Sequence, residues 1–287
     1  MAKRLVSVWQ PYFLASKDRD AVLDAAGELE DLGYTRIWFS AGFQDGVPAR
    51  FREILDGTKS IGVAPGILSI WHSDPADVAA FVADAEQAHP GRFLLGLGTS
   101  HAAIVDQQDA GQYRKPYSKM VSFLDGLDAA GVTPEQRVLA ALGPRMLELS
   151  RDRSRGAHPY FIPVEHTAEA RATLGPDGLL APEVAVVLEA DAERARTVAR
   201  EYMTGYLTLP NYTQNLLRLG WTEADFAGGG SDQLVDALIP WGTPEQVAAG
   251  IEKHYRAGAD EVTIQVLGVD RRQFPADAFR TLAAALI

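Results

Sequence analysis

Eight short, continuously apolar runs alternate with segments of helical periodicity, and this alternation constrains the fold of the chain most. The runs predict strands at 4–9, 35–40, 60–71, 92–97, 137–142, 158–162, 182–190 and 261–267. Helices are predicted between them at 18–34, 49–58, 73–89, 113–130, 143–155, 165–174, 191–207 and 243–259. Strands that are apolar throughout, rather than at alternate positions, are typical of parallel sheets covered on both faces.

Chain length decides between the two common parallel architectures. Eight βα units in 287 residues fit a closed barrel better than an open, doubly wound sheet. The sequence therefore predicts an α/β protein with one (β/α)8 TIM-barrel domain over residues 1–287. Residues 208–241 are irregular or helical, and we expect them to form an insertion between the seventh and eighth βα units.

Charge and cysteine content narrow the classes of partner. Lys and Arg total 27 against 38 Asp and Glu, a net charge of −11 that argues against nucleic-acid or anionic membrane partners. The absence of cysteine excludes disulfides, thiolate nucleophiles and zinc–thiolate sites. The first apolar run is cut by Gln10-Pro11, too early for a signal peptide, and no apolar run has the length of a membrane helix. We expect a cytoplasmic protein.

The stretch "PGRFLLGLGTSH", residues 90–101, marks a candidate active site. Its predicted strand ends in Gly98, Thr99, Ser100 and His101. Barrel active sites lie at the carboxyl ends of the strands, and small residues there let a ligand approach the backbone. The imidazole of His101 can exchange a proton near neutral pH. The alternative is a tight turn with a hydrogen-bonded structural histidine.

Other strand ends offer further candidates. Two helices open directly after strands, at Gly143-Pro144-Arg145 and at Glu165-His166-Thr167, and helix N-termini bind anions. These two segments are interpreted either as a phosphate-binding pocket or as ordinary helix starts. His72 and His166 are weaker candidates of the same kind as His101, and the others are taken as surface or structural residues: His89, His158 and His254.

The sequence lacks the motifs of metal-binding, hydrolase and dinucleotide-binding sites. No two histidines have metal-ligand spacing beside carboxylates, so we expect no metal. A G-x-S-x-G elbow is absent, and "GLGTSH" lacks the third glycine of a dinucleotide fingerprint. Pro65-Gly66 interrupts the third strand, which predicts either a bulge or a strained peptide against a ligand. Trp9, Trp38 and Trp71 fill the core or wall a flat ring.

Five motifs, in order along nearly the whole chain, resemble the bacterial luciferase-like monooxygenase superfamily. They are "APGILSIWHSDP", "HPGRFLLGLGTSH", "AALGPRMLELSRDRSRGAHPYFIPVEHT", "LPNYTQNLLRLGW" and "GSDQLVDALIPWGTPEQV". The resemblance is strongest to the actinobacterial branch of oxidoreductases that depend on the deazaflavin coenzyme F420. It implies a (β/α)8 barrel with a flavin or deazaflavin at its carboxyl-end mouth, and a homodimer.

The resemblance also implies site residues. A non-prolyl cis peptide would fall at Gly66-Ile67, and the cofactor phosphate would lie over the loops after strands five and six. Some relatives carry a carboxylate acid where His101 stands and a histidine at the end of strand two, where this chain has Ser40-Ala41-Gly42. The implied cofactor-binding residues are Ser40, Gly66, Ile67, Leu68, Gly98, Thr99, Ser100, His101, Leu142, Gly143, Pro144, Glu165, His166 and Thr167.

These observations lead to three functional hypotheses. The first is an F420-dependent oxidoreductase that moves a hydride between the deazaflavin and a small organic substrate, with His101 as the proton donor. The second keeps the fold and uses flavin mononucleotide (FMN) and molecular oxygen in a monooxygenase. The third is a barrel that binds a cofactor without turnover, which the missing strand-two histidine favours. In the 208–241 segment, Asn211, Tyr212, Trp221 and Gly228–Gly230 are candidates for a lid or pocket.

Overall fold

A curled sheet of parallel strands forms the centre of the molecule. The computed structural model describes residues 4–41, 46–108, 110–270 and 272–287. Within them the strand order is β7-β6-β5-β4-β3-β2-β1-β9-β8, and every neighbouring pair is parallel. The strands are β1 (Leu5–Trp9), β2 (Arg36–Ala41), β3 (Gly62–Ser69), β4 (Leu95–Gly98), β5 (Arg137–Leu139), β6 (Gly156–Ala157), β7 (Leu179–Leu180), β8 (Glu183–Val186) and β9 (Glu261–Val266).

The two ends of this row of strands meet in one segment of chain. β7 and β8 are separated only by Ala181 and Pro182. On one side, the Ala181 N–H donates to the Ala157 carbonyl at 2.9 Å. On the other side, the Thr263 N–H donates to the Pro182 carbonyl at 2.9 Å. The sheet therefore curls back toward itself, as in the predicted TIM barrel.

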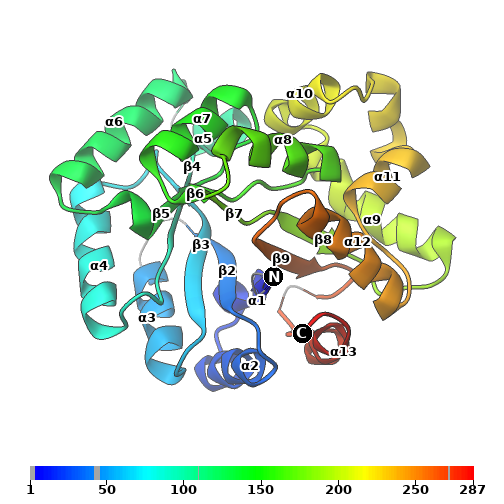
Figure 1. Cartoon of the computed structure of the whole chain (residues 1–287), viewed down its shortest axis with the longest axis horizontal. Coiled ribbons are helices and arrows are strands. Elements are labelled where there is room, and N and C mark those ends of the chain that lie inside the picture. The colour runs from blue at the N-terminus through cyan, green and yellow to red at the C-terminus, as the bar shows by residue number, and fades with distance from the viewer. Residues whose placement is uncertain (1–3, 42–45, 109, 271) are drawn as a thin grey trace.

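Helices surround the sheet (Figure 1). Polar caps fix several starts: the Asp18, Asp74 and Thr243 side chains accept backbone N–H bonds at the ends of α2, α4 and α12. The helices are α1 (Tyr12–Ala15), α2 (Arg19–Asp31), α3 (Val47–Gly57), α4 (Pro75–Ala88), α5 (Ala102–Gln108), α6 (Pro116–Ala129), η1 (Pro134–Gln136), α7 (Pro144–Arg153), α8 (Val164–Leu174), α9 (Ala192–Tyr206), α10 (Pro210–Arg218), η2 (Glu223–Gly229), α11 (Asp232–Leu238), α12 (Pro244–Arg256) and α13 (Ala276–Leu286).

The sixth strand differs from its prediction. The ladder pairs only 156–157, and the apolar run 158–162 follows it on the way to α8. Phe161 has φ +56°, a left-handed conformation that a regular strand does not contain. The short β7 was not predicted at all. Of the two alternatives predicted for His158 and His254, surface or structural, the structure shows the second, since both side chains are buried, His254 on the inner face of α12.

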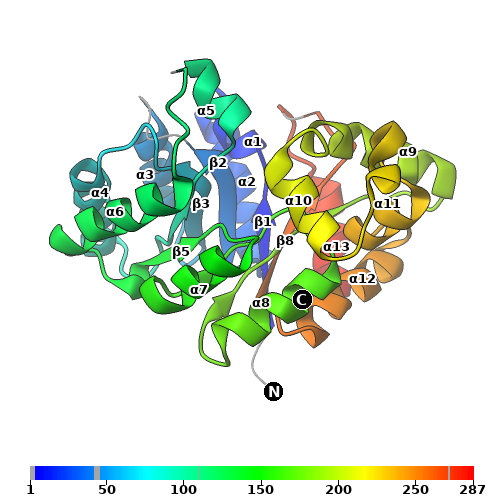
Figure 2. The same ribbon diagram turned by 90° about the horizontal axis from the view of Figure 1, so that it is seen from above.

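The 208–241 segment forms α10, η2 and α11. Figure 2 shows α10 and α11 beside α9, on the side of the sheet opposite α4 and α6. The segment shares an apolar cluster with the sheet and with α9, and buried members include Ala185, Met203, Tyr212, Leu216 and Leu234. In the part of the chain that the structure describes, no helix is both long and apolar enough to cross a membrane.

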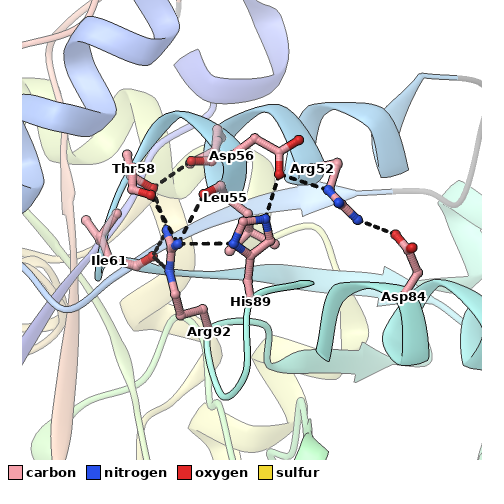
Figure 3. A network of polar contacts seen from close by, with 9 residues as sticks. Arg52, Leu55, Asp56, Thr58, Ile61, Asp84, His89 and Arg92 are labelled. Atoms are coloured by element: carbon pink, nitrogen blue, oxygen red, sulfur yellow. Dashed lines mark hydrogen bonds and ion pairs between the residues drawn. The ribbon is translucent and has the colours of Figure 1, made fainter. Parts of the chain in front are cut away.

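A polar network joins the end of α3 to the segments that precede β3 and β4 (Figure 3). The Nε2–H of His89 donates to Asp56 Oδ1 at 2.6 Å. Arg92 donates to the hydroxyl of Thr58 at 2.6 Å and to the Ile61 carbonyl at 3.0 Å. His89 is therefore structural, one of the two alternatives expected for it, and lies at the amino ends of the strands, opposite the carboxyl ends.

Candidate active site

A cavity of about 750 Å³ opens at the carboxyl ends of the strands. It is large enough for a flat cofactor with part of a substrate. Ten of the predicted cofactor residues line it, from the ends of β2, β3, β4 and β5: Ser40, Gly66, Ile67, Gly98, Thr99, Ser100, His101, Leu142, Gly143 and Pro144. Gly42, which follows β2, lies outside the described residues.

Two glycines in the cavity lining, Gly66 and Gly98, are closely packed by neighbouring side chains. The Gly66–Ile67 peptide is cis, as the family resemblance implied, and the β2–β3 register shifts beside it. The Trp9 indole N–H donates to the Gly66 carbonyl at 3.0 Å. A Cβ on Gly66 would lie 2.6 Å from that indole nitrogen, and a Cβ on Gly98 would lie 2.6 Å from Ile67 Cγ1. Glycine at these two positions therefore allows the side chains of Trp9 and Ile67 to pack directly against the backbone of the cavity wall.

The strand-four tip is held by hydrogen bonds to its carbonyls. The Trp71 indole donates to Thr99 O at 2.6 Å, and the Asn211 amide donates to Ser100 O at 3.1 Å. The imidazole of His101 follows this tip. Its Nδ1 is buried and has no hydrogen-bond partner among the described residues. Burial lowers the pKa of His101 below 6.5, so the ring is neutral at pH 7.

His158 lies in the same cavity wall, although its strand position was predicted differently. Its Nδ1 is 2.6 Å from the Ala181 carbonyl, which only accepts, so Nδ1 carries the proton. The ring stacks on Trp38 with centroids 4.1 Å apart and planes 8° apart. Burial lowers the pKa of His158 to about 4. The Nε2 atom has no partner in the described chain.

A cluster of tyrosines forms the wall next to the 208–241 segment. Tyr202 donates to the Tyr160 hydroxyl at 2.9 Å, and Tyr160 donates to Gln265 Oε1 at 2.9 Å. Tyr206 and Tyr212 complete the cluster. Burial holds the pKa values of Tyr160, Tyr202 and Tyr212 well above 10, so these phenols are neutral. The spacing of Tyr202 and Tyr206, four residues apart on α9, was a usable signal for an aromatic face.

The predicted phosphate region is only half present in the cavity lining. Gly143 caps α7 there, and the exposed Arg145 places its guanidinium 4.2 Å from the Tyr117 ring centroid. The remaining four predicted residues do not line the cavity: Leu68 and Thr167 are buried, Glu165 is exposed, and His166 is buried beneath the β5–α7 loop. Likewise His72, Trp221 and Gly228–Gly230 do not line it.

His166 supports the loop instead. Its Nε2–H donates to the Leu142 carbonyl at 2.8 Å. Thr167 is 2.8 Å from Nδ1 of the buried His254, so its hydroxyl is engaged inside the fold. His166 therefore supports Leu142 from behind, and none of the side chains of 165–167 lines the cavity.

The cavity carries few charges. Its lining, within the described chain, includes Arg145 and no Asp or Glu. His101 and His158 are neutral at pH 7 because burial lowers both pKa values. Nor does the described part of the chain hold a group of three or more His, Cys, Asp or Glu side chains suited to a metal ion. The wall therefore suits an uncharged ring system, with an anionic end toward Arg145.

Fold and site together define an α/β protein with a ligand cavity at the carboxyl ends of parallel strands, the arrangement of TIM-barrel enzymes. Residues 7–130 match the model of the luciferase-like monooxygenase family, which confirms the resemblance for the two motifs within this range, at 64–75 and 89–101. No match was found among curated proteins.

Solved structures show the same fold at low identity. An F420-dependent secondary alcohol dehydrogenase in complex with an F420–acetone adduct superposes with a TM-score of 0.75 and 13% identity, over 99% of this chain and 98% of that one. The coenzyme F420-dependent tetrahydromethanopterin reductase from Methanopyrus kandleri also has a TM-score of 0.75 and 13% identity, over 100% of this chain and 99% of that one. The oxygenating constituent of 3,6-diketocamphane monooxygenase from Pseudomonas putida, in complex with FMN, has a TM-score of 0.70 and 13% identity, over 99% of this chain and 96% of that one.

Proposed function

We propose that this chain is an F420-dependent oxidoreductase that moves a hydride between the deazaflavin and a small organic molecule. In this account the curled sheet is a closed (β/α)8 barrel, and residues 208–241 are the insertion that forms one wall of its mouth. The main support for this proposal is the state of His101. Its imidazole is neutral, one buried ring nitrogen has no partner among the described residues, and it lines a cavity whose described lining has no carboxylate.

The residues present fit a flat cofactor. The cavity has a volume of about 750 Å³, and Trp9, Ile67 and His158 give it largely flat or apolar walls. Arg145 and the N-terminus of α7 would hold the phosphate, since a helix N-terminus and a guanidinium both favour anions. Two F420-dependent enzymes are among the solved structures that share this fold, which makes the deazaflavin a reasonable first cofactor to test.

His101 would manage the proton. When bound, the deazaflavin supplies the hydride chemistry. As an alcohol gives up a hydride from carbon, its O–H proton must leave, and the neutral His101 ring can accept it. In the reverse direction the imidazolium returns that proton to the carbonyl oxygen. The tyrosine wall and Asn211 would orient the substrate and exclude water.

Turnover tests this proposal. Oxidised F420 with a panel of small alcohols, and reduced F420 with the matching carbonyl compounds, are followed by deazaflavin absorbance with and without oxygen. The proposal expects turnover of F420 with one substrate class and no oxygen uptake. Oxygen uptake with reduced FMN, and none of these F420 reactions, would contradict it.

The FMN monooxygenase remains the second candidate because the fold likeness extends to an FMN-bound monooxygenase. The cavity volume and Arg145 serve that cofactor equally. An oxygen electrode separates the two candidates, since only the flavin reaction consumes oxygen.

A further inference from the structure

His158 is built into the cavity as a fixed hydrogen-bond acceptor. Its side chain is 1% exposed and lines the cavity. The bond from Nδ1–H to Ala181 O fixes the tautomer, and the stack on Trp38 fixes the ring plane. The lone pair of Nε2 is left as the only free hydrogen-bonding site of the imidazole.

No donor among the described residues reaches that lone pair. A Cβ built on Gly66 would lie 3.5 Å from Nε2, so the backbone there is close but offers no side chain. The nearby indole N–H of Trp9 already donates to the Gly66 carbonyl. An unsatisfied buried acceptor costs about 1–3 kcal/mol and is rare in folded proteins. The remaining source of a donor is a group that enters the cavity beside Gly66, and since Nε2 itself has almost no exposed surface, the atoms that cover it must shift when that group binds.

We propose that His158 Nε2 accepts a hydrogen bond from the imide N–H of the pyrimidinedione ring that flavins and deazaflavins share. This inference rests on the proposed cofactor class. The imide is the donor that the two oxidised rings have in common, and a neutral imidazole is its natural acceptor. His158 thereby acts as a binding residue of the cavity, distinct from the proton-handling His101.

Two substitutions separate the acceptor from the rest of the side chain. In His158→Asn, the amide can still donate to Ala181 O, but no atom stands at the Nε2 position. In His158→Gln, the longer amide restores an oxygen near that position. Thermal unfolding of both variants checks that the barrel remains folded.

The experiment measures dissociation constants for F420 and for FMN, with the ¹⁵N resonances of histidine-labelled wild type recorded in parallel. We expect His158→Asn to raise the dissociation constant about tenfold and His158→Gln to stay within about threefold of wild type. The Nε2 resonance that is missing from the Asn variant should move upfield on binding.

The outcomes of this experiment are distinguishable. If folded His158→Asn binds as tightly as wild type, or the Nε2 resonance stays in place, the inference is overturned and the proposed function stands. If the wild type binds neither F420 nor FMN, the proposed cofactor class fails, and this inference fails with it. Which cofactor binds the wild type identifies the source of the imide.

Discussion

The ring of His101 lies against the ring of Tyr212, with centroids 4.9 Å apart. This contact joins the tip of β4 to α10, a helix more than a hundred residues later in the chain. The hydrogen bond from Asn211 to Ser100 O, next to it, joins the same two elements. The 208–241 segment therefore helps to set the position and the burial of His101.

Replacing His101 tests the proton-handling role. His101→Ala should lower turnover by about 10²–10⁴-fold, the usual contribution of a positioned acid or base. Cofactor affinity should change less than about threefold. The wild-type rate of alcohol oxidation should rise with pH through an apparent pKa below 6.5, because burial lowers that pKa and only the neutral ring accepts a proton. Unchanged turnover would remove His101 from the mechanism.

Gly98, in the cavity lining, has no room for a methyl group. In Gly98→Ala the new Cβ would meet Ile67 at 2.6 and 2.7 Å, so the Ile67 side chain or the backbone must shift. We expect the free energy of unfolding to fall by about 1–3 kcal/mol in denaturant titrations. Gly143→Ala is the matched control, because nothing lies within 4 Å of its Cβ position and its φ is −84°. Equal stability of the two variants would refute this reading.

Glu183 makes stability depend on pH. Burial raises its pKa to about 8, above the usual 4.5 of a glutamate in an unfolded chain, so its contribution to stability is fully present below pH 4.5 and is lost as the pH rises through 8. Glu183→Gln cannot ionise. Chemical denaturation should find the variant more stable than wild type by roughly 3–5 kcal/mol at pH 9, and within about 1 kcal/mol at pH 5. Parallel stability curves for the two proteins would show that Glu183 is not the cause.

The 165–167 segment is predicted to act through the loop that it supports. His166→Ala removes the donor to Leu142 O, so stability should fall by about 1–3 kcal/mol, and cofactor affinity should fall with it. Glu165→Ala, at the neighbouring exposed position, should leave both within about 0.5 kcal/mol. If Glu165→Ala weakened cofactor binding more than His166→Ala, these residues would bind the cofactor directly.

The sequence predicted the parallel sheet because its core strands are apolar throughout and its helices carry capping residues. The tip at 98–101 followed from the position of a strand end. The predicted bulge in the third strand is present, since Pro65-Gly66 breaks the ladder where the register shifts.

His158 and its neighbours could not be placed from the sequence. β6 and β7 have only two residues each, Gly156-Ala157 and Leu179-Leu180, so neither has the length or composition of a strand signal. The apolar run at 158–162 resembles a strand in composition, but it lies outside the ladder. For His254 a signal existed, since Val247, Ile251 and His254 follow helical spacing on one buried face.

Fluorescence titration of the purified apo-protein with F420, and separately with FMN, tests the central claim most directly. We expect F420 to bind saturably at micromolar or lower concentration, and FMN to bind more weakly. Tighter binding of FMN, or no binding of F420, would contradict it.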